Sequence, residues 1–256
     1  MSQKVWFITG ASTGFGRAVT EHALQQGDNV VATLRKPDVL SDLLSKYSSR
    51  LLVLSLDVRE LEQIHAAFEN ALERFGRVDI VFNNAGFCII SEAEGMREER
   101  GRELFEVLFW GAANVSREAV MIFRERNHPP GGRSDAAGIA HYAAAYLLSN
   151  PLSFRQTHVW STAVDPIHPA YADPSLPSRK IRNLYPGELA VRVHDGDPKK
   201  FARAMYQLAY MEDPPLYIPL HRVAIEAART KGEELIQTAE EYASWSDDVY
   251  YRVSQN

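Results

Sequence analysis

The chain has 256 residues, of which 45% are hydrophobic and 24% are charged, as is usual for a soluble globular domain. Its net charge of −5 and the lack of a Lys/Arg run argue against a nucleic-acid partner. A single cysteine, Cys88, excludes an internal disulfide, and no run of about 18 apolar residues could span a membrane. The first expected strand begins at Lys4, which leaves no room for a signal peptide, so a cytoplasmic protein is expected.

An apolar run followed by glycines opens the chain. Residues 5–8 (VWFI) are predicted to form a strand, and residues 9–16 (TGASTGFG) form a turn into a helix expected from Arg17. Gly10, Gly14 and Gly16 have no Cβ, so the turn can be tight and its backbone can approach a diphosphate. The positive end of the following helix would attract that anion. The pattern predicts a dinucleotide site, and an ordinary βα turn is the alternative.

Strands and helices alternate through the first half of the chain. Short apolar runs with β-branched residues predict strands over 29–34, 51–56 and 78–82. Helices are expected over 37–47, over 61–75 with Gly76 as terminator, and over about 98–127. This alternation predicts an α/β fold with a doubly wound parallel sheet, the Rossmann fold, in a single domain over 1–256.

Three motifs, in order and on the expected elements, resemble those of the short-chain dehydrogenase/reductase family. They are Thr9-Gly10-x-x-x-Gly14-x-Gly16, then Leu56-Asp57-Val58 after the third strand, then Asn83-Asn84-Ala85-Gly86 after the fourth. The resemblance covers residues 1–133 and 166–248, and its C-terminal part is similar to a fungal-type branch. It implies a nicotinamide cofactor, hydroxyl–ketone interconversion on a small apolar substrate, a role in secondary metabolism, and a homo-oligomer that pairs the helices of 98–127.

The resemblance also assigns residues to the cofactor. The Asp57 carboxylate would accept a hydrogen bond from the adenine amino group, although it could instead cap a helix. The backbone of 84–86 would pack beside the adenine ribose. No metal site is expected, because no histidine has ligand spacing with Cys or carboxylates. The residues expected to bind the cofactor are Gly10, Ser12, Thr13, Gly14, Phe15, Gly16, Arg35, Asp57, Val58, Asn84, Ala85 and Gly86.

The end of the second strand favours NADP over NAD. An acidic residue there would bind the ribose 2′-hydroxyl of NAD, but Leu34 occupies that position and Arg35 follows it. A guanidinium can pair with a 2′-phosphate through two N–H groups. The alternative is a surface Arg35-Lys36 pair before Pro37.

The catalytic residues of the family are not found. Relatives use a Tyr-x-x-x-Lys helix, whose spacing puts both side chains on one face, and a serine about a dozen residues earlier. No lysine here stands four residues after a tyrosine. The nearest analogue is Tyr142, with Tyr146 in the lysine position, and Leu108 replaces an asparagine. The catalytic residues are therefore unknown; Tyr142 is a weak candidate, and packing against an Ala-rich helix is its simpler role.

The segment 134–165 is irregular. After Gly132-Arg133 relatives continue with a buried fifth strand beside the fourth, but SDAAGIAH (134–141) is not such a strand. That strand is expected to be missing or replaced by 158–164, which could instead be the family's sixth strand. Residues 134–165 could come from a frameshift or mis-splicing, belong to a protein that has lost catalysis, or form an unfamiliar site from Tyr142, Tyr146 or Ser161.

The region 166–256 is expected to carry the substrate loop and the last helices. A helix should begin at Asp197, a short strand should follow over 216–220, and a final helix should run from Ile225 to about Trp245. In relatives these elements lie over the substrate pocket.

Overall fold

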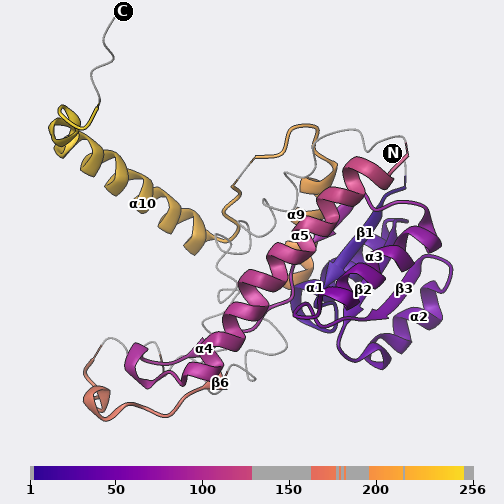
Figure 1. Cartoon of the computed structure of the whole chain (residues 1–256), viewed down its shortest axis with the longest axis horizontal. Helices are drawn as coiled ribbons and strands as arrows, with labels where there is room; N and C mark the ends of the chain where they lie inside the picture. The colour runs from indigo at the N-terminus through magenta and orange to yellow at the C-terminus, as the bar shows by residue number, and fades with distance from the viewer. Residues whose placement is uncertain are drawn as a thin grey trace, which may run out of the picture.

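A computed structural model describes residues 3–128, 163–176, 179, 182, 196–215 and 217–250. Its first half alternates strand and helix: β1 (Val5–Thr9), α1 (Gly14–Gln25), β2 (Asn29–Leu34), a 3₁₀ turn (Pro37–Leu40), α2 (Ser41–Tyr47), β3 (Leu51–Ser55), α3 (Leu61–Phe75) and β4 (Ile80–Phe82). The four strands form one parallel sheet in the order β3-β2-β1-β4, of which β1, β2 and β3 are labelled in Figure 1. The expected doubly wound α/β fold is confirmed.

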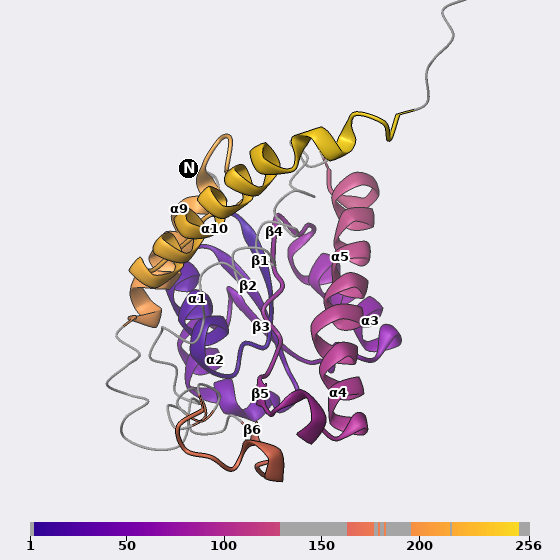
Figure 2. The same cartoon turned by 90° about the vertical axis from the view of Figure 1, so that its left-hand side faces the viewer.

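Helices cover both faces of this sheet, so alternate residues of each strand enter different cores. Trp6 and Ile8 of β1 pack with α1 and with α9 (Pro198–Tyr210). Val5 and Phe7 pack with α3 and with α5 (Ala112–Met121). Figure 2 shows the two layers on opposite sides of the strands. A parallel sheet buried on both faces is the reason why its strands read as continuous apolar runs.

The helices begin and end close to where the sequence places them. α3 ends at Gly76, whose φ of +76° is a left-handed conformation that suits glycine. α1 begins at Gly14 rather than at Arg17, so the glycine turn already contributes to the helix. The long helical region consists of α4 (Glu98–Phe105), a π-helical stretch (Glu106–Gly111), α5 and a second π-helical stretch (Ile122–Arg126).

A second, two-stranded sheet was not predicted. β5 (Ile89–Ile90) pairs in parallel with β6 (Ala163–Val164), while β4 pairs with β1 alone among the described strands. Residues 163–164, the described part of the expected substitute strand, therefore lie against β5 rather than β4. Residues 134–162 lie outside the described residues, and with them Tyr142, Tyr146 and Ser161.

A buried ion pair joins the end of β5 to a distant part of the chain. Arg182 donates from Nε to Glu92 Oε1 at 3.1 Å and from Nη2 to Glu92 Oε2 at 2.6 Å, and both side chains are buried. Hydrogen bonding from Arg182 lowers the pKa of Glu92. Arg182 also donates to the backbone oxygen of Asp165, whose carboxylate accepts from Arg100 at 2.7 Å. These contacts fasten the residues after β6 to the region between β5 and α4.

Asp28 anchors α9 to the sheet. Its buried carboxylate accepts hydrogen bonds from Trp6 Nε1 at 2.8 Å and from the Tyr210 hydroxyl at 2.7 and 2.8 Å. The backbone N–H of Lys4 also donates to it at 3.0 Å. Burial is the main cause that raises the pKa of Tyr210, so this hydroxyl remains a donor. The C-terminal region is thereby attached to the first two strands.

The last elements differ in part from expectation. Asp197 caps α9 by accepting from the backbone N–H of Lys199 at 2.8 Å. The short strand expected over 216–220 is wrong for its described residues, 217–220, which have no regular structure. α10 (Arg222–Glu241) and a 3₁₀ turn (Ala243–Ser246) then extend away from the sheet (Figure 1). None of the helices among the described residues is long and apolar enough to cross a membrane.

Candidate functional site

The turn between β1 and α1 is packed so tightly that it requires glycine at two positions. Gly10 has a φ of +66°, and a Cβ there would lie 2.9 Å from the Cα of Ala85. A Cβ on Gly16 would lie 2.3 Å from the carbonyl oxygen of Gly10 and 2.7 Å from Nδ2 of Asn84. Real Cβ atoms do not approach backbone this closely, so the turn depends on both glycines.

The Asn-Asn-Ala-Gly block fastens β4 to this turn. The backbone N–H groups of Asn84 and Ala85 both donate to Thr9 Oγ1 at 2.9 Å. Asn84 Nδ2 donates in return to the carbonyl oxygens of Thr9, at 2.9 Å, and Gly10, at 3.2 Å. Asn83 donates to the carbonyl oxygen of Ala112 at 2.8 Å, which also ties β4 to α5. The block therefore holds the carboxyl ends of β1 and β4 together.

A cavity of about 450 Å³ lies beside this turn, at the carboxyl ends of the strands. Open parallel sheets bind ligands at this edge. Ten of the twelve residues predicted to bind the cofactor line it, and Gly14 and Gly16 shape the turn beneath them. The lining residues are Gly10, Ser12, Thr13, Phe15, Leu34, Arg35, Leu56, Asp57, Val58, Arg59, Asn84, Ala85, Gly86, Phe87, Glu103 and Val107.

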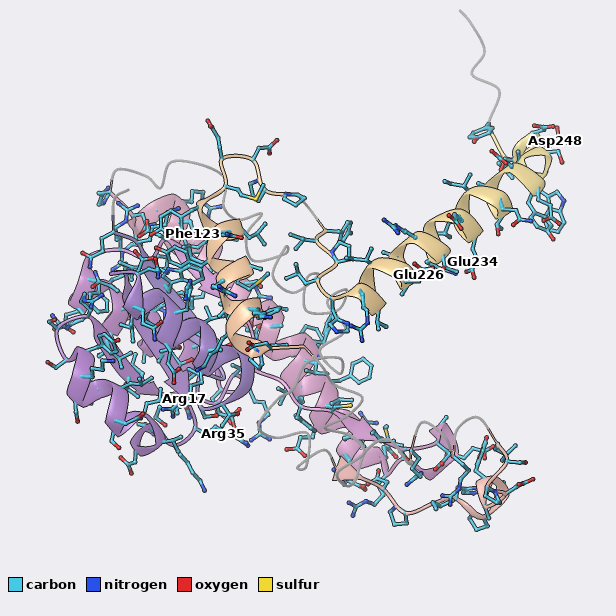
Figure 3. All side chains as sticks on the ribbon, turned by 180° about the vertical axis from the view of Figure 1, so that it is seen from behind. Arg17, Arg35, Phe123, Glu226, Glu234 and Asp248 are labelled. Atoms are coloured by element: carbon cyan, nitrogen blue, oxygen red, sulfur yellow. The ribbon has the colours of Figure 1, made fainter. Side chains whose placement is uncertain are left out.

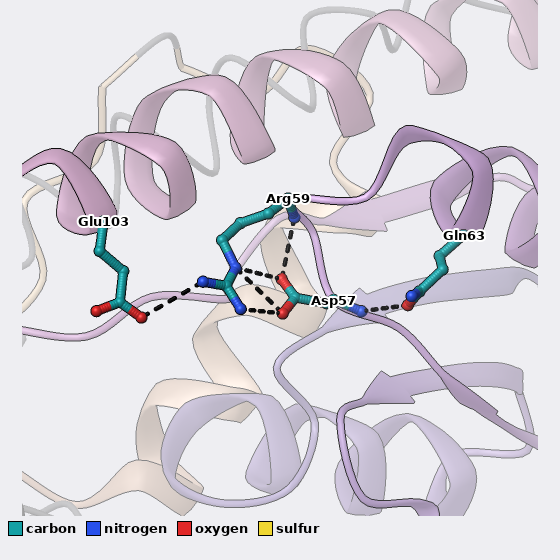
Figure 4. A network of polar contacts seen from close by, with 4 residues as sticks. All are labelled: Asp57, Arg59, Gln63 and Glu103. Atoms are coloured by element: carbon teal, nitrogen blue, oxygen red, sulfur yellow. Dashed lines mark hydrogen bonds and ion pairs between the residues drawn. The ribbon is translucent and has the colours of Figure 1, made fainter.

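One side of the cavity carries a polar network that was not predicted (Figure 4). Arg59 donates to Asp57 from Nε to Oδ1 at 3.0 Å and from Nη2 to Oδ2 at 2.6 Å. Its Nη1 lies 3.4 Å from Glu103 Oε1, and Gln63 Oε1 accepts from the backbone N–H of Asp57 at 2.8 Å. Hydrogen bonding from Arg59 holds the pKa of Asp57 below its usual value, so this carboxylate is charged at neutral pH.

The network modifies the role that the resemblance implies for Asp57. Arg59 occupies both carboxylate oxygens, so an adenine amino group would share this acceptor with the guanidinium. The contact between Arg59 and Asp57 could have been predicted from the sequence, because an arginine two residues after an acidic residue can reach back to it. The contact with Glu103 of α4 is set by the tertiary fold alone.

Arg35 lies at the rim of the same cavity, next to a buried Leu34. Its positive charge contributes to the low pKa of Asp57, which places the two groups near one another. Arg17, labelled with Arg35 in Figure 3, donates to Glu21 and Asp42. Arg35 makes no ion pair or hydrogen bond with the residues that the structure describes.

Two residues of the π-helical stretch beside the cavity bear on the site. Gly111 allows close packing, whereas Leu108 departs from the family pattern. A Cβ on Gly111 would lie 2.7 Å from Val58 Cγ2, so glycine lets the π-helical stretch pack against the residue after Asp57. Leu108, in the same stretch, is 41% exposed, and its side chain has no polar atom that could form a hydrogen bond with a water molecule. Among the described residues no group of His, Cys, Asp and Glu could hold a metal ion.

The comparisons with known proteins agree with this geometry. The family model of the short chain dehydrogenases matches residues 4–131. An uncharacterised oxidoreductase, C162.03, of Schizosaccharomyces pombe is 30% identical over 94% of this chain and 90% of its own. Oxidoreductase BOA17 of Botryotinia fuckeliana is 29% identical over 95% and 98% of the two chains.

A solved structure extends the likeness to almost the whole fold. The short-chain dehydrogenase from Streptomyces avermitilis matches 98% of this chain and 100% of its own with a TM-score of 0.76 and 28% identity. Family membership and the cavity together support a nicotinamide dinucleotide as the cofactor. The chain belongs to the short-chain dehydrogenase/reductase family of oxidoreductases.

Proposed function

We propose that the chain is a single-domain, NADP-dependent oxidoreductase of the cytoplasm, and that Arg35 binds the 2′-phosphate of the cofactor. The observation that carries the NADP preference is the position of Arg35 at the cavity rim, where it makes no ion pair with any described residue, next to a buried Leu34 where an NAD-binding acid would stand. The twelve predicted residues would hold the cofactor. Their backbone would cradle the diphosphate, and Asp57 would contact the adenine.

Replacing Arg35 by alanine should weaken NADPH binding about 10- to 100-fold, because a charge-assisted hydrogen bond contributes about 1.5–3 kcal/mol. NADH has no 2′-phosphate, so its dissociation constant should change little. Fluorescence titration of the bound nicotinamide measures both constants. Lys36→Ala removes an adjacent exposed cation and is the matched control. Equal losses for NADPH and NADH in R35A would show that Arg35 does not recognise the phosphate.

We further propose that the reaction interconverts a hydroxyl and a ketone on a small apolar molecule, as in secondary metabolism, within a homo-oligomer. Support comes from family membership and from the two fungal oxidoreductases that match most of the chain. Tyr142 is the candidate proton donor. NADPH oxidation followed by absorbance over a panel of ketones tests the activity, with Tyr142→Phe compared with Tyr146→Phe. No turnover above a no-enzyme control would reject this activity for the present chain.

A catalytically inactive binding protein, or the product of a mis-spliced or frameshifted gene, is the second candidate. The match to C162.03 runs over 269 aligned positions and covers 94% of this chain, so some aligned positions have no residue here. The serine and the Tyr-x-x-x-Lys helix expected from the family resemblance are likewise missing from the sequence. Sequencing transcripts across codons 130–166 tests this second candidate. A second transcript encoding those residues would assign catalysis to another product of the gene.

A further inference from the structure

Beyond its first turn, α10 is exposed to solvent on every face. Every residue from 225 to 250 is exposed except Gly232, which is half-buried, while Ala224 is buried at the point where the helix leaves the body. The exposed side chains include Leu235 at 59%, Ile236 at 62% and Trp245 at 76%. Figure 3 shows the helix extending away from the sheet, with Glu226, Glu234 and Asp248 marking its course. An apolar surface of this kind is typical of a protein interface.

Five apolar or small residues of α10, with Tyr242 directly after it, form a regular seam. They recur at alternating intervals of three and four residues, which keeps them on one face of a helix, as in a coiled coil. The seam consists of Ile225, Ala228, Gly232, Leu235, Ala239 and Tyr242.

This seam is symmetric about its midpoint, which lies between Glu233 and Glu234. If two copies of α10 lie antiparallel about that point, each seam residue faces a seam residue of the second copy. Ile225 then faces Tyr242 of the second copy, Ala228 faces Ala239, and Gly232 faces Leu235. Such self-complementarity is what a twofold symmetric interface requires.

Nothing among the described residues requires glycine at position 232. A Cβ at this position would meet none of their atoms within 4 Å, and the residue lies in the middle of a helix. Glycine destabilises a helix interior by about 1 kcal/mol relative to alanine. Close approach of a partner's Leu235 would give that glycine a function.

Charge selects the antiparallel arrangement. Residues 222–231 contain Arg222, Arg229 and Lys231 against one acid, Glu226, whereas residues 232–250 contain six acids and no basic residue. Parallel helices would bring two acidic halves together. Antiparallel helices place each acidic half beside a basic half, so the electrostatic energy favours this orientation.

We propose that the chain forms a homodimer through antiparallel pairing of α10 along this seam. The interface is distinct from the pairing of helices within 98–127 that the family resemblance implies. It is also independent of whether the chain is catalytically active.

Sedimentation equilibrium of the full chain tests the dimer. At about 50 µM, well above a micromolar dissociation constant, the mass should be twice the 28.8 kDa of the chain. Leu235→Glu should raise the dimer dissociation constant at least about 100-fold, because the charge enters the seam twice. Gln237→Glu adds the same charge on the opposite face of α10 and should leave the mass unchanged. Circular dichroism verifies that both variants are folded.

Disulfide trapping tests the orientation. Ala228→Cys and Ala239→Cys are each made in a Cys88→Ser background and oxidised mildly. In the antiparallel dimer identical positions lie 11 residues apart along the axis, about 16 Å, which a disulfide cannot span. Neither protein alone should therefore cross-link, but an equimolar mixture should. Cross-linking of either protein with itself would overturn the antiparallel arrangement.

Two further results would overturn the proposal as a whole. The first is a monomeric mass at the same concentration, which would show that the seam binds no second copy. The second is a dimer that survives Leu235→Glu but is lost in Trp110→Glu. Trp110 is 50% exposed on the helical region of 98–127, so that outcome would locate the interface there.

Discussion

A Gly16→Ala variant should lose NADPH binding by about 100-fold and should be about 2–3 kcal/mol less stable. The added Cβ would lie 2.3 Å from the Gly10 carbonyl oxygen, 2.9 Å from the Gly10 carbonyl carbon and 2.7 Å from Asn84 Nδ2. Two of these atoms are backbone of the glycine turn, which must move to make room. Because the turn lines the cavity and opens α1, its displacement would misplace the backbone N–H groups proposed to bind the diphosphate.

The matched control is Gly232→Ala, which adds the same methyl group to another helical glycine. A Cβ at Gly232 meets nothing within 4 Å, so NADPH affinity should stay at the wild-type value. Calorimetric titration gives the affinity and chemical denaturation gives the stability. If G16A bound NADPH as tightly as wild type, the glycine turn would not be part of the cofactor site.

An Asp28→Ala variant should lose about 3–4 kcal/mol of stability, since it leaves one buried and two half-buried donors without their acceptor. The Trp6 indole N–H, the Tyr210 hydroxyl and the Lys4 backbone N–H all donate to this carboxylate. Asp28 is 2% exposed, so water cannot replace it as acceptor. The melting temperature should fall by about 8–12 °C for a chain of this size.

Two further variants separate loss of these hydrogen bonds from a general effect of losing an acid. Asp213→Ala removes an exposed carboxylate and should change stability by less than about 0.5 kcal/mol. Tyr210→Phe combined with Asp28→Ala completes a double-mutant cycle, in which coupling between the two sites is expected. Additive losses in that cycle would indicate that Asp28 does not hold α9 through Tyr210.

The first half of the fold could be predicted because its signals are local. β2 occupies the predicted residues 29–34, and α3 occupies 61–75, where apolar spacing and a terminating glycine agree. The same is true of the cavity, because glycine turns and strand ends bring Gly10, Asp57 and Asn84 to one edge of a parallel sheet.

The features that were missed depend on contacts between distant residues. β5 and β6 have two residues each and are more than 70 residues apart, so neither has a periodicity to detect. The Arg59–Glu103 contact joins the end of β3 to α4, and only the packed structure brings them together. Residues 217–220 looked like a strand because they are apolar, but no strand among the described residues pairs with them.

The catalytic signature of the family is absent from the sequence, whereas ten of the twelve residues predicted to bind the cofactor line one cavity. Arg35, the glycine turn and the Asn83–Gly86 block all lie among the described residues, whereas the Tyr142 region lies outside them. Cofactor binding can be measured independently of turnover, and it is the more direct test.

The decisive measurement is isothermal titration of the purified, folded wild-type chain with NADPH, with NADH titrated in parallel. The account predicts saturable binding of one NADPH per chain and weaker binding of NADH, because only NADPH carries the phosphate that Arg35 would receive. A chain that is folded by circular dichroism and yet binds neither nucleotide would contradict it.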